Sequence, residues 1–98
     1  MNLGFITTVV LCELNWSLQR AYKLSKTDRL SIIDDVLSAA ELEVENETLC
    51  RKALSAARKG SADFADYLIR EIALASGCSV VLTFDKAAQK SEGFEEPR

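Results

Sequence analysis

The 98-residue sequence contains no histidine, and this absence excludes more chemistry than any other feature of its composition. Without imidazole the chain cannot build a histidine-based catalytic triad, and it lacks the commonest general base. A zinc site is not expected either, because Cys12, Cys50 and Cys78 stand far apart and form no Cys-x-x-Cys pair. We expect reduced, buried thiols. Chemistry here must depend on carboxylates, hydroxyls or a metal held by oxygen.

Long apolar runs and an excess of positive charge are missing as well. No run reaches the roughly 20 residues that cross a bilayer, and Met1–Cys12 has no basic lead or cleavage pattern. We therefore predict a cytoplasmic protein with no membrane segment. The net charge of −3 argues against a broad basic nucleic-acid surface. It is compatible with a nuclease, because a metal bound by acids inverts the local charge.

The order of the expected elements predicts one domain over residues 1–98 with α/β architecture and a parallel sheet. Expected strands are Phe5–Thr7, Leu42–Glu45 and Cys78–Phe84. Two helices precede the second strand, and two more precede the third. Their expected N-caps are Thr7 or Thr8, Ser25, Asn46 and Ser61, with Gly60 and Gly77 as stops. Ligands of such sheets sit beyond the carboxyl ends of the strands, where Thr7–Thr8 and Thr83–Asp85 stand.

Helical spacing also predicts which side of each helix is buried. The first helix, Val9 to about Tyr22, is expected to bury Val10, Leu11, Leu14, Leu18, Ala21 and Tyr22. The last is expected to bury Phe64, Leu68, Ile72 and Ala75, and to carry Asp63, Asp66, Tyr67 and Arg70 on another face.

Four acids stand where they could share a divalent cation. Asp63 and Asp66 lie one turn apart at a helix start, and Asp85 follows the last strand. Glu13 is the only charged residue from Met1 through Gln19, and burying a lone carboxylate there is costly unless it is bonded. Mg²⁺ and Mn²⁺ prefer such oxygen ligands. Further candidates are Thr83 and Ser61 for a metal-bound water, and Arg58, Lys59, Arg70 and Lys86 for a phosphate backbone.

Each of these residues also has a purely structural interpretation, which the sequence leaves open. Asp63 could simply favour the helix dipole, and Asp66 could pair with Arg70 one turn later. Asp85 could be an ordinary N-cap. The four cations could be solvated surface charges.

Taken together, the segments Val9–Leu18, Leu42–Glu45, Ala62–Ile69 and Gly77–Asp85 resemble the PIN-domain family, and within it the VapC-type toxins of toxin–antitoxin pairs. The resemblance covers almost all of the chain. It implies a Mg²⁺- or Mn²⁺-dependent endoribonuclease that hydrolyses RNA phosphodiesters and is inhibited by a cognate antitoxin protein. Glu13 matches the family's helix glutamate, and Asp66 the aspartate of its Asp-x-Leu-Ile-type helix. Asp63 matches an accessory acid, and Asp85 the aspartate after the following strand.

The family's opening strand carries an Asp-x-Asn motif that has no counterpart before Phe5. We therefore expect an N-terminally truncated three-layer PIN-like fold that lacks the first strand and the first helices. Rearranged pairing or a second chain would close the gap, giving a homo-oligomer with strand exchange. The absent aspartate makes a non-catalytic, antitoxin-binding or self-associating module the alternative function. A DNA-processing or ribosomal-RNA nuclease is a third.

Overall fold

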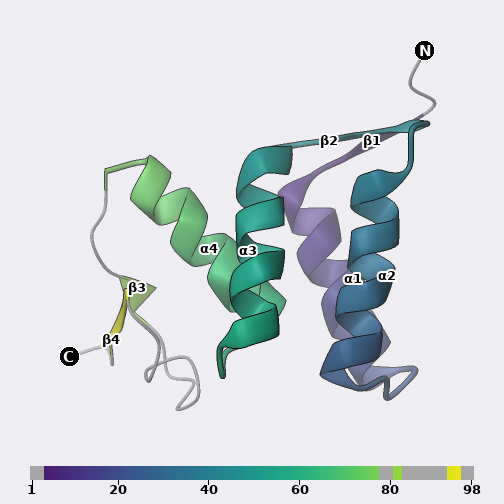
Figure 1. Cartoon of the computed structure of the whole chain (residues 1–98), viewed down its shortest axis with the longest axis horizontal. Helices are drawn as coiled ribbons and strands as arrows, with labels where there is room; N and C mark the ends of the chain where they lie inside the picture. The colour runs from purple at the N-terminus through teal and green to yellow at the C-terminus, as the bar shows by residue number, and fades with distance from the viewer. Residues whose placement is uncertain (1–3, 78–80, 83–92, 96–98) are drawn as a thin grey trace.

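The computed structural model describes residues 4–77, 81–82 and 93–95. Four helices stand side by side, with one short strand pair across their ends and a second pair beyond the last helix (Figure 1). In chain order the elements are β1 (Gly4–Ile6), α1 (Thr8–Arg20), α2 (Lys26–Ser38), β2 (Leu42–Val44), α3 (Glu47–Lys59), α4 (Phe64–Ala75), β3 (Val81–Leu82) and β4 (Phe94–Glu95).

The strands pair in parallel, which confirms the predicted α/β class. β1 pairs with β2 so that Ile6 lies opposite Val44, and the next residue, Glu45, donates its backbone N–H to the Ile6 carbonyl at 2.8 Å. β3 pairs with β4. Among the described residues the strands form these two separate pairs rather than one sheet. Of the expected strand Cys78–Phe84, only Val81 and Leu82 lie within the described residues.

Most of the predicted helix starts are confirmed, and one is wrong. Thr7 and Ser25 cap α1 and α2, and their side chains accept the backbone N–H groups of Val10 and Asp28. Asn46 precedes α3 in a left-handed conformation without a side-chain cap bond. α4 is capped by Asp63, not by Ser61. The aspartate provides a charged acceptor at a helix N-terminus, where negative charge is favoured.

The buried side of α1 matches the predicted one only in part, since Leu11 and Leu18 are buried as expected. The helix buries Leu11, Cys12, Asn15 and Leu18, whereas Val10 is 44% exposed and Tyr22, beyond the helix end, is 70% exposed. The prediction followed the apolar residues and passed over Asn15, which is completely buried. α1 is therefore turned so that an amide faces inward. The physical reason is that this amide has hydrogen-bonding partners inside, described below.

The predicted inner face of α4 is only partly right. Phe64 and Leu68 are buried as expected, but Tyr67, expected on the acidic face, is also buried, at 2% exposure. Its hydroxyl accepts the Ala62 backbone N–H at 3.4 Å, and its ring meets Phe94 of β4 edge-on with centroids 6.0 Å apart. Gly60 makes room for this hydroxyl, since a Cβ there would collide with it. Tyr67 thus joins the segment before α4 to β4.

Two cysteines behave as predicted. Cys12 and Cys50 are free and buried within the core. Burial raises the pKa of the Cys50 thiol to about 11, so the group is protonated at neutral pH. Cys78 lies outside the described residues. None of the helices among the described residues is long and apolar enough to span a membrane.

Candidate active site

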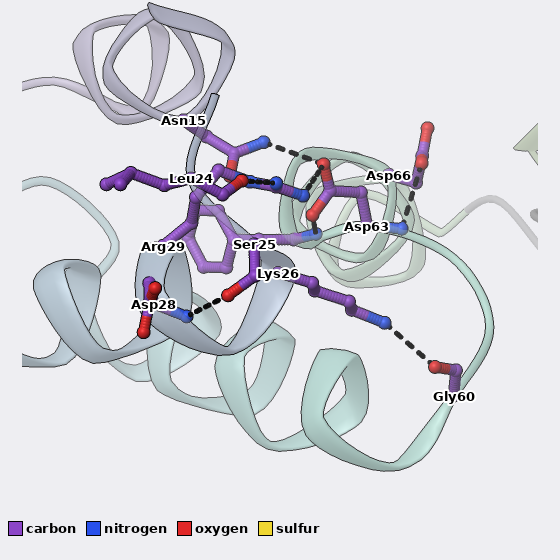
Figure 2. A network of polar contacts seen from close by, with 10 residues as sticks. Asn15, Leu24, Ser25, Lys26, Asp28, Arg29, Gly60, Asp63 and Asp66 are labelled. Carbon is purple, nitrogen blue, oxygen red and sulfur yellow. Dashed lines mark hydrogen bonds and ion pairs between the residues drawn. The ribbon is translucent and has the colours of Figure 1, made fainter. Parts of the chain in front are cut away.

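Asp63 lies at the centre of a polar network that joins three helices (Figure 2). Its Oδ2 atom accepts hydrogen bonds from Asn15 Nδ2 of α1 and Arg29 Nη2 of α2, both at 3.1 Å. Its Oδ1 atom accepts the Phe64 backbone N–H at 2.8 Å. The Asp63 side chain also accepts the backbone N–H of Asp66 in the capping box. The carboxylate therefore fixes the start of α4 against α1 and α2.

The partners of Asp63 are themselves buried and bonded to each other. Asn15 is 0% exposed and Arg29 is 6% exposed. Arg29 Nε donates to Asn15 Oδ1 at 3.2 Å, and Arg29 Nη1 donates to the Leu24 carbonyl at 2.7 Å. Buried polar groups are costly unless they are paired, and each group here has a partner. The network is therefore compatible with burial in the middle of the fold.

This environment stabilises the charged form of Asp63. Burial alone would raise the pKa of the carboxyl group. The hydrogen bonds from Asn15 and from the Phe64 backbone, together with the positive charge of Arg29, outweigh that effect and hold the pKa below its usual value of 3.8. Asp63 is consequently an anion at neutral pH, fully engaged with its neighbours.

Asp66 stands one turn further along α4 and completes the cap. Its Oδ2 atom accepts the Asp63 backbone N–H at 3.2 Å, so the two aspartates form a reciprocal capping box. The pKa of the Cys12 thiol on α1 is raised mainly by burial of the thiol, and the negative charge of Asp66 raises it further. The Asp66 carboxylate thus lies close enough to α1 to interact electrostatically with Cys12.

Both aspartates line a cleft of about 340 Å³ between α1, the beginning of α2 and the beginning of α4. α1 contributes Trp16, Gln19 and Arg20, and α2 contributes Lys26 and Arg29. Ser61, Ala62 and Ala65 line the remaining side. The cleft therefore combines two acids, three cations and an aromatic ring.

Glu13 lies beside this cleft rather than inside it. Its side chain is exposed, so the expected cost of burying it does not arise. It lines a shallow pocket along α1 together with Trp16, Ser17, Arg20 and Ala21. Trp16 and Arg20 also line the cleft of Asp63 and Asp66, and the two hollows are therefore neighbours.

The remaining predicted site residues, Asp85 and Thr83, lie outside the described residues. Within residues 4–77, 81–82 and 93–95, no three acids or cysteines come together closely enough to hold a metal. The structure thus unites Asp63 and Asp66, whereas Glu13 lines a separate pocket that shares Trp16 and Arg20 with their cleft. A metal-binding role for the set stays a prediction.

Of the cations that the sequence suggested, Arg58, Lys59 and Arg70 do not line the cleft, and Lys86 lies outside the described residues. Arg58 pairs with Asp34, and the Arg70 guanidinium lies over the Tyr67 ring, 4.8 Å from its centroid. Instead, the cleft contains Arg20, Lys26 and Arg29. One signal in the sequence could have revealed Arg29 and its partner Asn15. Both stand at the helical spacing of buried apolar residues: Asn15 with Leu11 and Leu18, and Arg29 with Leu30 and Ile33.

Comparison with known proteins assigns the chain to a family. A family model described as the PIN domain matches residues 2–92, so the chain belongs to the PIN domain family. PIN domains are in general nucleases that depend on divalent metals. No match was found among curated proteins, and none among solved structures.

Proposed function

We propose that this PIN domain is a Mg²⁺- or Mn²⁺-dependent endoribonuclease of the VapC type, the toxin of a toxin–antitoxin pair. The observation that carries the proposal is the pair Asp63 and Asp66, which meet at the start of α4 in one cleft with three cations. Family membership supplies the general activity. The RNA target and the antitoxin partner are parts of the proposal.

The donor set fits a hard divalent cation in kind, because every candidate is a carboxylate. Asp66 and Glu13 would hold the metal together with Asp85, which lies outside the described residues. When bound, such a metal supplies an activated water and stabilises charge on the phosphate. Asp63 would serve as the accessory acid. Four N–H groups already donate to the Asp63 side chain. Its role would therefore be to fix the start of α4, which positions Asp66 in the cleft.

The cations of the cleft have a role in the same proposal. RNA brings negative charge towards two carboxylates, which by themselves would repel it. Arg29 neutralises Asp63 through their 3.1 Å ion pair. Lys26 lies at the edge of the cleft, where its Nζ donates to the Gly60 carbonyl at 2.9 Å. A phosphate can therefore enter beside Asp66 without facing two uncompensated acids.

The test is cleavage of a labelled single-stranded RNA with Mn²⁺ or Mg²⁺ by the purified chain and two variants. We expect Asp66→Asn and Glu13→Gln to lose cleavage, since each replaces a charged oxygen ligand with a neutral amide. Asp35→Asn is the matched control, because Asp35 is an exposed acid of α2 outside both hollows. Cleavage that survives in Asp66→Asn would refute the proposed site.

The alternative of a non-catalytic module gives a different result. In that case the folded chain would neither cleave RNA nor respond to Mn²⁺, yet would bind a protein partner. The toxin assignment has its own test. Expression of the wild-type chain in bacteria should arrest growth, whereas Asp66→Asn should not. Arrest that is equal in both would count against a toxin acting through RNA cleavage.

A further inference from the structure

Trp16 is an aromatic residue in an unusual position for a structural role. It is the only tryptophan of the chain, and it is 42% exposed on α1. Its side chain borders both the cleft of Asp63 and Asp66 and the pocket of Glu13. An indole normally contributes most to the stability of a fold when its large apolar surface is covered. Here part of that surface is open on a residue that borders the hollows of the acids proposed to cleave RNA.

Arg20 stands one turn after Trp16 on the same side of α1, since residues four apart share a helix face. It is exposed and borders the same two hollows. The Arg20 side chain makes no hydrogen bond or ion pair within the described part of the chain, so its guanidinium is available to a ligand. Arg29, in contrast, forms an ion pair with Asp63. Of the two arginines of the cleft, Arg29 therefore holds the acid in place, and Arg20 can contact a ligand.

The local charge of the cleft also differs from that of the whole protein. Its lining carries the three cations Arg20, Lys26 and Arg29 against the two carboxylates Asp63 and Asp66, and Glu13 of the neighbouring pocket brings the sum over both hollows to zero, whereas the chain carries −3. An aromatic ring beside cations is the combination that binds single-stranded nucleic acid, because the ring stacks on a base and the cations contact the backbone. A double helix does not offer its bases for such stacking.

We propose that Trp16 and Arg20 form a nucleotide-binding subsite for single-stranded RNA, with one base stacked on the indole and a neighbouring phosphate bound by the guanidinium. The subsite deepens the proposed function, on which it rests. Trp16 and Arg20 border the hollows of both Asp66 and Glu13, so RNA bound to them would lie beside both acids. The chain would thus select unpaired RNA through stacking rather than through base-edge hydrogen bonds.

The single tryptophan makes binding directly observable. A short mixed-sequence single-stranded RNA is titrated into the protein in EDTA, so that metal-dependent cleavage does not interfere. We expect quenching of the Trp16 fluorescence, and no quenching by the same sequence as an RNA duplex. Anisotropy of labelled RNA then compares variants. Trp16→Ala should weaken binding about 5- to 100-fold, whereas Trp16→Phe, which keeps a ring, should lose much less.

Arg20→Ala is expected to weaken binding and to make it less dependent on salt. Loss of one phosphate contact lowers the slope of log affinity against log salt by about 0.7 for a single strand. Tyr22→Ala is the matched aromatic control, since Tyr22 is 70% exposed and lines neither hollow. Lys52→Ala on α3 is the matched cation control. Both should leave affinity and salt slope unchanged.

The outcomes separate the subsite from the nuclease activity. Quenching and variant effects without cleavage in Mn²⁺ would uphold the subsite and overturn the proposed function. Cleavage without quenching, with Trp16→Ala and Arg20→Ala binding as tightly as wild type, would overturn the subsite alone. Equal quenching by the duplex, or quenching by single-stranded DNA but not by RNA, would overturn it as well. Circular dichroism confirms that each variant is folded.

Discussion

Two ion pairs of equal length lie in different surroundings in this protein. Arg29 Nη2 and Asp63 Oδ2 are 3.1 Å apart, and so are Arg58 Nη2 and Asp34 Oδ2. The side chains of the first pair are 7% and 22% exposed, whereas those of the second are 50% and 40% exposed. Distance therefore does not distinguish the pairs. Burial and the number of further bonds do.

The difference lies in what would be left behind if one partner were removed. Arg29 also bonds Asn15 and the Leu24 carbonyl, so its loss would leave a carboxylate, an amide and a carbonyl short of donors in a region with little water. Arg58 has one such bond, and water can replace it. Removing one partner of a buried ion pair lowers the free energy of unfolding strongly, although the pair itself adds little net stability. Removing one partner of an exposed pair changes the free energy of unfolding little.

The largest expected effect follows from breaking the buried pair. We expect Arg29→Met to lower the free energy of unfolding by about 3 kcal/mol, because Asp63 would remain charged and partly buried without its cation. Urea denaturation followed by circular dichroism measures the change. The same experiment on the double variant Arg29→Met/Asp63→Asn should recover part of the loss, since no unpaired charge remains. A loss below about 1 kcal/mol in the single variant would show that water reaches the network.

The second prediction concerns acid. Asp63 has a pKa below its usual value of 3.8 in the folded protein, so its contribution to stability is present above that value. The contribution is lost as the pH falls through the lowered pKa. We therefore expect the difference in unfolding free energy between wild type and Asp63→Asn to shrink as the pH falls below 3.8. Urea denaturation across this range measures it. A difference that stays constant would exclude a lowered pKa for Asp63.

Some features of the fold and of the site follow from local sequence patterns, and others depend on contacts between distant residues. The parallel α/β class and the caps at Thr7 and Ser25 follow from local patterns, and the structure confirms them. Local patterns also placed Asp63 and Asp66 at the start of α4. They did not reveal that Asn15 and Arg29 turn inward, because apolar periodicity treats a buried amide or guanidinium as a surface residue.

The partners of Asp63 come from residues 34 and 48 positions away in the chain, and such contacts are set by helix packing. No spacing rule identifies them from the sequence alone. The same reason explains the choice of N-cap: Ser61 and Asp63 are both good caps by residue type, and Asp63 also bonds Arg29 and Asn15. Tertiary bonding thus decided between two locally acceptable starts. Arg58, Lys59 and Arg70 were predicted from closeness in sequence and do not line the cleft, and Lys86 lies outside the described residues.

A third and smaller stability effect separates the two aspartates of α4. Asp66→Asn removes a charge from the first turn of the helix, while its amide oxygen can still accept the Asp63 backbone N–H. We expect a loss of about 0.5–1 kcal/mol in unfolding free energy, together with the loss of RNA cleavage proposed above. Thermal denaturation and the cleavage assay measure the two properties side by side. A loss as large as that of Arg29→Met would mean that Asp66 belongs to the structural network and not only to the site.

The smallest expected effect comes from the exposed pair and completes the comparison. Arg58→Ala should change the unfolding free energy by at most about 0.5 kcal/mol, since water and salt replace its single bond to Asp34. The measurement is the same urea denaturation, at low and at high salt, and the variant should approach wild type as salt rises. If Arg58→Ala cost as much as Arg29→Met, the equal 3.1 Å distances would matter more than burial. Of the bonds of Asp63, only its cap of α4 would then indicate a structural role.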